Sequence, residues 1–138
     1  MTVSKFAIQH RILLGAITII TTLAGCIASN AADHVTLEQA RADHESGKVM
    51  LVDIRETREH QTGVAQGAVL LPMSELPQKQ NLLPKNPDLP VLLICNTQNR
   101  SKATLQSLKQ QGYQNIRYVD GGMSQWASKG WPMVIPNK

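Results

Sequence analysis

The chain has 138 residues, a length typical of a single domain. Its content of 42% hydrophobic and 17% charged residues is that of a globular protein and excludes an intrinsically disordered chain. The formal net charge is +4. Lysine and arginine form no run and do not alternate with aromatic residues, so this charge does not indicate nucleic-acid binding.

The first 25 residues are predicted to be an export signal. Lys5 and Arg11 precede residues 12–25, a stretch of 14 residues without a charge. A membrane-spanning helix needs about 20 apolar residues, so this stretch fits the apolar region of a signal peptide better.

The export signal ends in Leu23-Ala24-Gly25-Cys26, which resembles the lipobox of bacterial lipoproteins. The resemblance implies that Cys26 is acylated, becomes the mature N-terminus and anchors a periplasmic protein to the membrane. Ordinary cleavage within residues 28–32 and an uncleaved anchor remain as alternatives, and each of the three exports the domain. We therefore predict a signal peptide at 1–25, a tether at 26–34 and one domain at 35–138.

The remaining chain alternates helical and strand patterns. Thr36 is predicted to cap a helix that runs to about Glu45. Apolar runs predict four strands, at 49–54, 68–71, 91–95 and 116–119. Helices are expected at 57–61, 74–83, 101–111 and 123–128, with an exposed helix around Glu59 and His60. This alternation predicts an α/β fold with a parallel sheet of four to five strands and helices on both faces.

Two strands end in side chains that can carry chemistry. Cys95 closes one apolar run and Asp53 closes another. Ligands of open parallel sheets bind beyond the carboxyl ends of the strands, so both residues are expected at a binding crevice. If Cys26 is acylated, Cys95 is the only free thiol of the mature chain. A lone cysteine in an oxidising compartment is either buried and inert or kept for its reactivity.

The segment after Cys95 indicates reactivity. It joins a strand end to a helix start, so its backbone N–H groups and the positive end of the helix dipole can favour an anion at the sulfur. Arg100 adds a permanent positive charge that can receive an anionic donor. The residues expected to form this cradle are Asn96, Thr97, Gln98, Asn99, Arg100 and Ser101.

The motif Cys95-(x4)-Arg100-Ser101 resembles the active-site loop of rhodaneses, and two flanking segments extend the resemblance over residues 35–134. The first segment is Asp53-Ile54-Arg55-Glu56 with Glu59, Gly63, Gly67-Ala68 and Pro72, and the second is Tyr118-Val119-Asp120-Gly121-Gly122 with Trp126, Gly130 and Pro132. Three segments in the family's order are a specific signal, whereas a single C-x4-R motif would be weak.

The resemblance implies a rhodanese-like fold and a sulfurtransferase that moves sulfane sulfur through a Cys95 persulfide. The donor would be thiosulfate or a persulfide, and the acceptor would be cyanide or a thiol. Asp53 and Arg55 are expected to support the crevice as a structural pair. No metal, organic cofactor, nucleic acid or obligate protein partner is implied.

Two residues depart from the family pattern. Rhodaneses often have a basic or small residue after the cysteine and glycine three residues after it, where this chain has Asn96 and Gln98. If the backbone were left-handed at Gln98, a side chain there would cost about 1 kcal/mol. The missing basic side chain argues against efficient use of thiosulfate.

Two other functions are weighed against sulfur transfer. A non-catalytic rhodanese-like module would bind a partner through the same crevice, because a fold alone does not establish catalysis. Arsenate reductases and dual-specificity phosphatases share this fold but use a C-x5-R loop. The four residues between Cys95 and Arg100 form a smaller ring, which suits one sulfur atom better than a tetrahedral oxyanion.

Overall fold

The computed structural model describes residues 32–137, and the predicted signal peptide with Cys26 lies outside these residues. The strands are β1 (His34–Val35), β2 (Met50–Asp53), β3 (Val69–Leu70), β4 (Val91–Ile94) and β5 (Ile116–Val119). The helices are α1 (Leu37–Glu45), α2 (Thr57–His60), α3 (Leu76–Lys79), α4 (Asn99–Gln110) and α5 (Gly122–Ser128), with a 3-10 helix, η1, at Gln80–Leu82.

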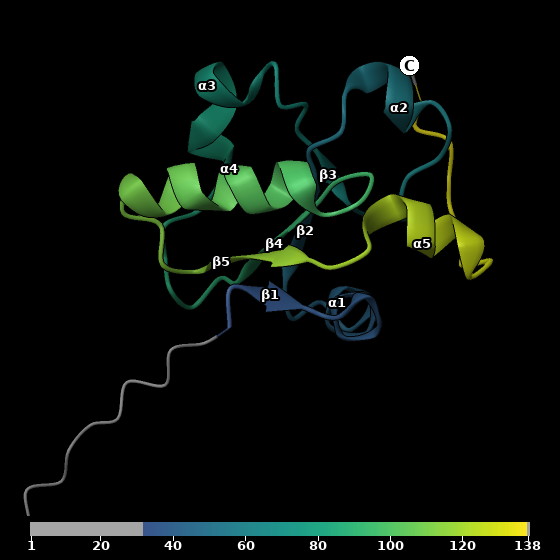
Figure 1. The fold of residues 1–138 in the computed structure, drawn as a ribbon, viewed down its shortest axis with the longest axis horizontal. Coiled ribbons are helices and arrows are strands. Elements are labelled where there is room, and N and C mark those ends of the chain that lie inside the picture. The colour runs from purple at the N-terminus through teal and green to yellow at the C-terminus, as the bar shows by residue number, and fades with distance from the viewer. Residues whose placement is uncertain (1–31, 138) are drawn as a thin grey trace, which may run out of the picture. The chain divides into compact units, whose positions relative to one another are not determined.

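The five strands form one sheet in the order β1-β5-β4-β2-β3, and every pairing among them is parallel (Figure 1). Strand β4 lies at the centre because its four side chains are all aliphatic and can be buried on both faces. All four are fully buried. The predicted parallel α/β fold is confirmed.

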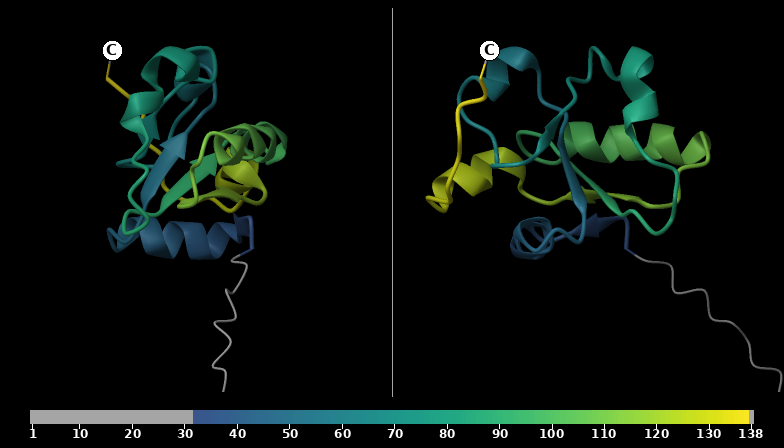
Figure 2. Two further views of the ribbon diagram at one scale, coloured as in Figure 1. Left: turned by 90° about the vertical axis from the view of Figure 1, so that its left-hand side faces the viewer. Right: turned by 180° about the vertical axis from the view of Figure 1, so that it is seen from behind.

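Helices cover both faces of the sheet, as predicted. On one face, Leu93 packs in a cluster with Leu105 and Leu108 of α4. On the other face, Leu92 packs in a second cluster with residues of α1 and α5, including Trp126. Neighbouring side chains of a strand point to opposite faces, so β4 contributes to both clusters. Two further views show α1 and α4 on opposite sides of the strands (Figure 2).

Strand β1, which forms one edge of the sheet, was not predicted. Thr36 caps α1 as expected, since its Oγ1 accepts a hydrogen bond from the Gln39 N–H at 3.2 Å. Strand β1 precedes it and begins at His34, the last residue of the expected tether. The Tyr118 N–H donates to the Asp33 carbonyl at 2.9 Å, which ties this segment to β5.

No helix within residues 32–137 combines the length and the apolar character that crossing a membrane requires.

Candidate active site

Cys95 lies at the carboxyl end of β4, where the central strand meets the turn that leads into α4. Its side chain is only 1% exposed. The Ser101 N–H donates to Cys95 Sγ at 3.4 Å, and Ser101 Oγ lies at the same distance from the sulfur. Ser101 is in the first turn of α4, so a free backbone N–H at a helix N-terminus points at the sulfur. This arrangement favours negative charge on Cys95.

Helix α5 holds the loop from the opposite side. The Met123 N–H donates to the Cys95 carbonyl at 2.8 Å, and the Ser124 N–H donates to the Asn96 carbonyl at 2.9 Å. Gly122 lies in close contact with the loop carbonyls. A β-carbon at Gly122 would be 2.1 Å from the Thr97 carbonyl oxygen and 2.4 Å from that of Cys95. The loop carbonyls are therefore directed towards α5, and close contact requires glycine at this position.

The remaining loop side chains lie at or near the surface. Asn96, Thr97 and Asn99 are exposed, and Gln98 is half-buried. None of the described side-chain hydrogen bonds joins these four residues to Cys95, and the backbone N–H that reaches the sulfur is that of Ser101. A role of these four residues in the cradle stays a prediction. Gln98 has φ −147°, so it is not left-handed and does not carry the strain considered for a residue that replaces glycine.

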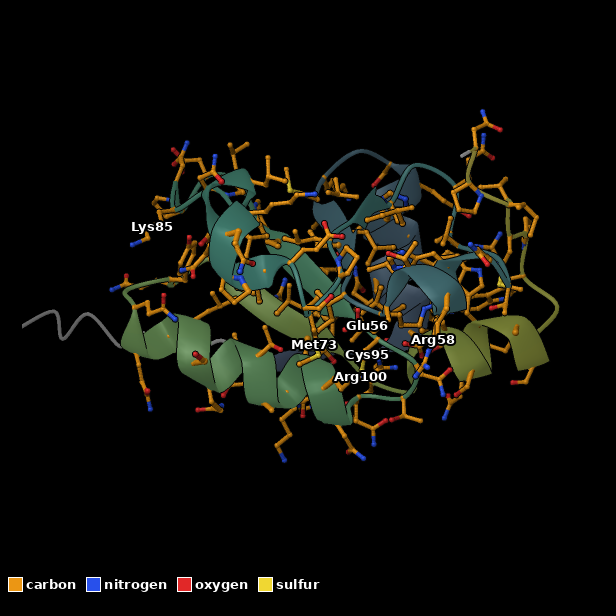
Figure 3. The ribbon with its side chains drawn as sticks, turned by 90° about the horizontal axis from the view of Figure 1, so that it is seen from above. Glu56, Arg58, Met73, Lys85, Cys95 and Arg100 are labelled. Carbon is orange, nitrogen blue, oxygen red and sulfur yellow. The ribbon has the colours of Figure 1, made fainter. Side chains whose placement is uncertain are left out.

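Arg100 is paired with Glu59 of α2 rather than left free at the loop. Arg100 Nη1 and Nη2 donate to the two carboxylate oxygens of Glu59 at 2.7 and 2.6 Å. Arg100 lowers the pKa of Glu59 to about 2, and the carboxylate in turn raises the pKa of Arg100. Figure 3 shows Arg100 and Cys95 together at the N-terminal end of α4. Contact of Arg100 with an anionic donor remains a prediction, because the structure places its guanidinium on Glu59.

Asp53 and Arg55 form a buried ion pair at the carboxyl end of β2. Asp53 is fully buried, and Arg55 is 4% exposed. Arg55 Nη2 donates to Asp53 Oδ2 at 2.7 Å and to the Gly63 carbonyl at 2.8 Å. These bonds fix the segment that joins β2 to α2. The support that the pair gives to the site stays a prediction.

The burial of His60 contradicts the prediction that Glu59 and His60 lie on an exposed helix. Its side chain is only 3% exposed, and Glu59 on the same helix is partly buried by Arg100. His60 Nε2 lies 3.5 Å from Asp53 Oδ1, a distance that permits ionic attraction to a protonated ring, but the geometry forms no hydrogen bond. The prediction is wrong because a helix of four residues is too short for its sequence pattern to reveal which face is buried.

The Glu59 partnership was missed from the sequence. Glu59 and Arg100 are 41 residues apart, and only the fold brings α2 to the start of α4. The one available signal was the place of Glu59 in the first rhodanese-like segment. Within residues 32–137, no three His, Cys, Asp or Glu side chains are grouped so that they could hold a metal ion, and Cys95 is the free thiol of this part.

Comparison with known proteins identifies the family. The family model of the rhodanese-like domain matches residues 36–129, so the chain belongs to the rhodanese-like family. A protein from Allochromatium vinosum named sulfurtransferase is 37% identical over 107 residues, which are 78% of this chain and 96% of that protein.

Solved structures agree with the family. A rhodanese-related protein from Thermoplasma volcanium has a TM-score of 0.66 and 29% identity, covering 75% of this chain and 98% of its own. A human single-domain sulfurtransferase has a TM-score of 0.62 and 28% identity, covering 72% of this chain and 98% of its own. The family and these relatives support a sulfurtransferase role in general.

Proposed function

We propose that the protein transfers sulfane sulfur through a persulfide on Cys95. One observation carries the proposal: the Cys95 sulfur lies at the end of the central strand and receives the Ser101 N–H of the first turn of α4. A thiolate is the reactive form of cysteine in sulfur exchange, and this donor stabilises its charge.

The proposed reaction has two half-reactions. The Cys95 thiolate attacks the outer sulfur of thiosulfate, a sulfur–sulfur bond to Cys95 forms, the bond to the inner sulfur breaks, and sulfite leaves with the electron pair. An acceptor such as cyanide then attacks the outer sulfur of the persulfide and leaves as thiocyanate, which returns the thiolate. Ser101 supplies its N–H to the sulfur, and the carbonyls held by α5 keep the loop in place.

The charges near the sulfur favour an organic sulfur compound over thiosulfate as the usual substrate. Arg100 is neutralised by Glu59, and the four loop residues between Cys95 and Arg100 are uncharged. A dianion would therefore meet little uncompensated positive charge from the loop. In the proposal, thiosulfate is a donor that the protein accepts in an assay, and the usual substrate is an organic sulfur compound.

Mass spectrometry of the intact protein tests the proposal. After incubation with thiosulfate, the protein is expected to gain the mass of one sulfur atom, and cyanide is expected to remove it. Cys95→Ser should show no gain and should retain its fold, because the substitution is nearly isosteric at a buried site. Thermal unfolding of the variant checks the fold. If the wild type gains no sulfur from thiosulfate or from a small persulfide, the carrier mechanism is wrong and the partner-binding module is favoured.

The proposal also includes export and a lipid on Cys26. Its support is the apolar stretch 12–25 followed by the lipobox-like tetrapeptide. Cells expressing the full chain are expected to incorporate labelled palmitate, and Cys26→Ala should abolish the label. Periplasmic protein without label would contradict the lipid and leave export intact.

A further inference from the structure

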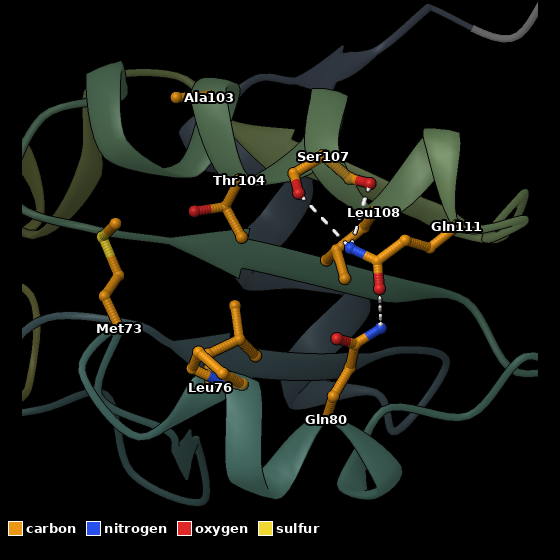
Figure 4. Close-up of a pocket in the computed structure, with 9 residues that line it drawn as sticks. Met73, Leu76, Gln80, Ala103, Thr104, Ser107, Leu108 and Gln111 are labelled. Atoms are coloured by element: carbon orange, nitrogen blue, oxygen red, sulfur yellow. Dashed lines mark hydrogen bonds between the residues drawn. The ribbon is translucent and has the colours of Figure 1, made fainter.

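A groove of about 530 Å³ lies between α4 and the segment formed by α3 and η1 (Figure 4). Its volume is in the range of sites that bind small organic molecules. None of its lining residues belongs to the loop from Cys95 to Ser101. The lining residues are Met73, Leu76, Pro77, Gln80, Ala103, Thr104, Ser107, Leu108 and Gln111.

The far end of the groove is closed by two amide side chains. Gln80 Nε2 donates to Gln111 Oε1 at 2.7 Å, which joins η1 to the residue after α4. Gln111 Nε2 in turn donates to the Ser107 carbonyl and hydroxyl (Figure 4). These bonds hold the two walls together at that end.

The near end of the groove begins beside the candidate active site. Ala103 and Thr104 are three and four residues after Arg100, and four and three residues before Ser107, so all four lie on one face of α4. Met73 forms the opposite wall and packs against the core cluster that contains Cys95. In the view of Figure 3, Met73, Cys95 and Arg100 are all seen at the N-terminal end of α4. The groove therefore begins about 4.5 Å along α4 from Arg100 and extends about 12 Å further, to Gln111.

The lining is chemically unsuited to inorganic anions. Met73, Leu76, Pro77, Ala103 and Leu108 are apolar, and the other lining residues carry uncharged amides or hydroxyls. Among residues 32–137, no ionisable side chain lines the groove. A dianion such as thiosulfate would lose hydration there without gaining a charged partner. An uncharged carbon body with amide groups would bury its apolar part and keep its hydrogen bonds.

We propose that this groove, the α3–α4 groove, binds the organic body of a small thiol, or of its persulfide, while the sulfur of that compound reaches Cys95. The proposal rests on the proposed function and names its substrate class. The acceptor thiolate attacks the outer sulfur of the Cys95 persulfide, a new sulfur–sulfur bond forms on the acceptor, and the bond to Cys95 breaks. Cys95 leaves as a thiolate, and the outer sulfur with its proton becomes the terminal group of the acceptor persulfide.

Filling the near end of the groove tests the proposal. Ala103 is exposed, so Ala103→Phe can place a ring at the groove without burying it in the core. Gln106→Phe is the matched control, since Gln106 is exposed on the same helix and does not line the groove. With the full chain and thiosulfate as donor, two acceptors are compared: cyanide, which needs no groove, and N-acetylcysteine amide, a neutral thiol with two amides.

The expected result is selective. Ala103→Phe should lower kcat/KM for N-acetylcysteine amide by about tenfold, while cyanide turnover and the Gln106→Phe variant stay near the wild-type values. A wild-type kcat/KM for N-acetylcysteine amide in Ala103→Phe, or a fall of equal size for both acceptors, would overturn the groove proposal and leave the Cys95 persulfide intact. Absence of a persulfide in the wild type would instead overturn the proposed function.

A binding measurement remains decisive if Ala103→Phe does not fold. The S-methyl ether of N-acetylcysteine amide cannot accept sulfur, so its binding to the wild-type chain is separate from turnover. Titration followed by NMR should shift the backbone amide signals of Ala103, Thr104 and Ser107. Shifts confined to other parts of the chain, or no shifts at all, would overturn the proposal.

Discussion

Ser101 is the residue that contacts the Cys95 sulfur most directly, and its two donors are not equivalent. Its side chain is fully buried. The hydroxyl has one hydrogen, and it donates to the Gln98 carbonyl at 3.1 Å while its oxygen lies 3.4 Å from Cys95 Sγ. The Cys95 thiol can therefore donate a hydrogen bond to this oxygen. An anionic sulfur must instead accept one, and the Ser101 hydroxyl can donate to it only if its hydrogen turns away from the Gln98 carbonyl. The backbone N–H of Ser101 is the donor that requires no such change.

Replacing Ser101 by alanine separates the two donors. Ser101→Ala should form the persulfide about tenfold more slowly than the wild type, because one hydrogen bond to a charged group contributes about 1.5 kcal/mol. The rate of sulfur gain from thiosulfate at constant pH measures the effect. Ser124→Ala is the control, since the Ser124 hydroxyl donates to the Gly121 carbonyl and not to the sulfur. A wild-type rate in Ser101→Ala would show that the backbone N–H alone is sufficient.

At the scale of single residues, the sequence could predict the contacts between residues that are close along the chain. Cys95 and Ser101 could be placed together because an apolar strand ends at one and a helix begins near the other. The pairing of Arg100 with Glu59 could not be predicted, since it depends on how α2 packs near α4. The burial of His60 depends on the same packing.

At the scale of elements, α5 supports the active-site loop through a contact that admits no side chain. Gly122 has φ +59°, and its missing β-carbon would overlap three loop carbonyls. Gly122→Ala should therefore lower the free energy of unfolding by about 2 kcal/mol or more, with slower persulfide formation because the loop must shift. Denaturant unfolding and the rate of sulfur gain measure the two effects.

Gly130 offers a matched control for this prediction. It has φ +65°, and nothing lies within 4 Å of the position that a β-carbon would take. Gly130→Ala should show only the cost of the left-handed backbone, about 1 kcal/mol, with persulfide formation unchanged. Equal losses of stability in the two variants would mean that the backbone conformation, and not contact with the loop, accounts for the effect at Gly122.

The Glu59–Arg100 pair joins α2 to α4, and its contribution should depend on pH. Because the pKa of Glu59 is lowered from 4.5 to about 2 in the folded protein, ionised Glu59 stabilises the fold. This stabilisation is complete above about pH 4.5 and is lost as the pH falls through about 2. Glu59→Gln should be less stable by about 1 kcal/mol at pH 7, with the difference shrinking between pH 4.5 and 2.

Urea unfolding at several pH values tests this dependence. Glu75→Gln serves as the control, because Glu75 pairs with Lys79 on the exposed surface of α3 and should change stability by less than about 0.5 kcal/mol. If the difference in the free energy of unfolding between Glu59→Gln and the wild type stays the same down to pH 2, the ion pair does not stabilise the fold.

Elements differed in how far sequence patterns could predict them. The cap at Thr36 and the apolar run at 116–119 predicted α1 and β5 closely, because each signal is local and strong. Strand β1 has two residues, which is too short for a repeating pattern, and only pairing with β5 makes it a strand. The order of strands in the sheet likewise depends on contacts between distant segments.

For the whole molecule, β1 determines where the folded domain begins. Val35 is buried at 6% exposure, and the Asp120 N–H donates to its carbonyl at 3.0 Å. Asp33 accepts from the Tyr118 N–H through its carbonyl and pairs with Lys109 of α4 through its side chain. The segment from Asp33 to Val35 thus covers the open edge of β5, although Asp33 and His34 belong to the expected tether.

Two shortened chains test this boundary. A chain of residues 36–138 should be less stable than one of residues 32–138 by about 2 kcal/mol, because it loses the buried Val35 side chain and the hydrogen bonds to β5. Denaturant unfolding gives the difference. Persulfide formation by the folded fraction should be equal in both, since β5 separates β1 from the strand that ends at Cys95. Equal stability would place the start of the domain at Thr36, whereas slower sulfur gain in the shorter chain would show that the edge strand also maintains the active site.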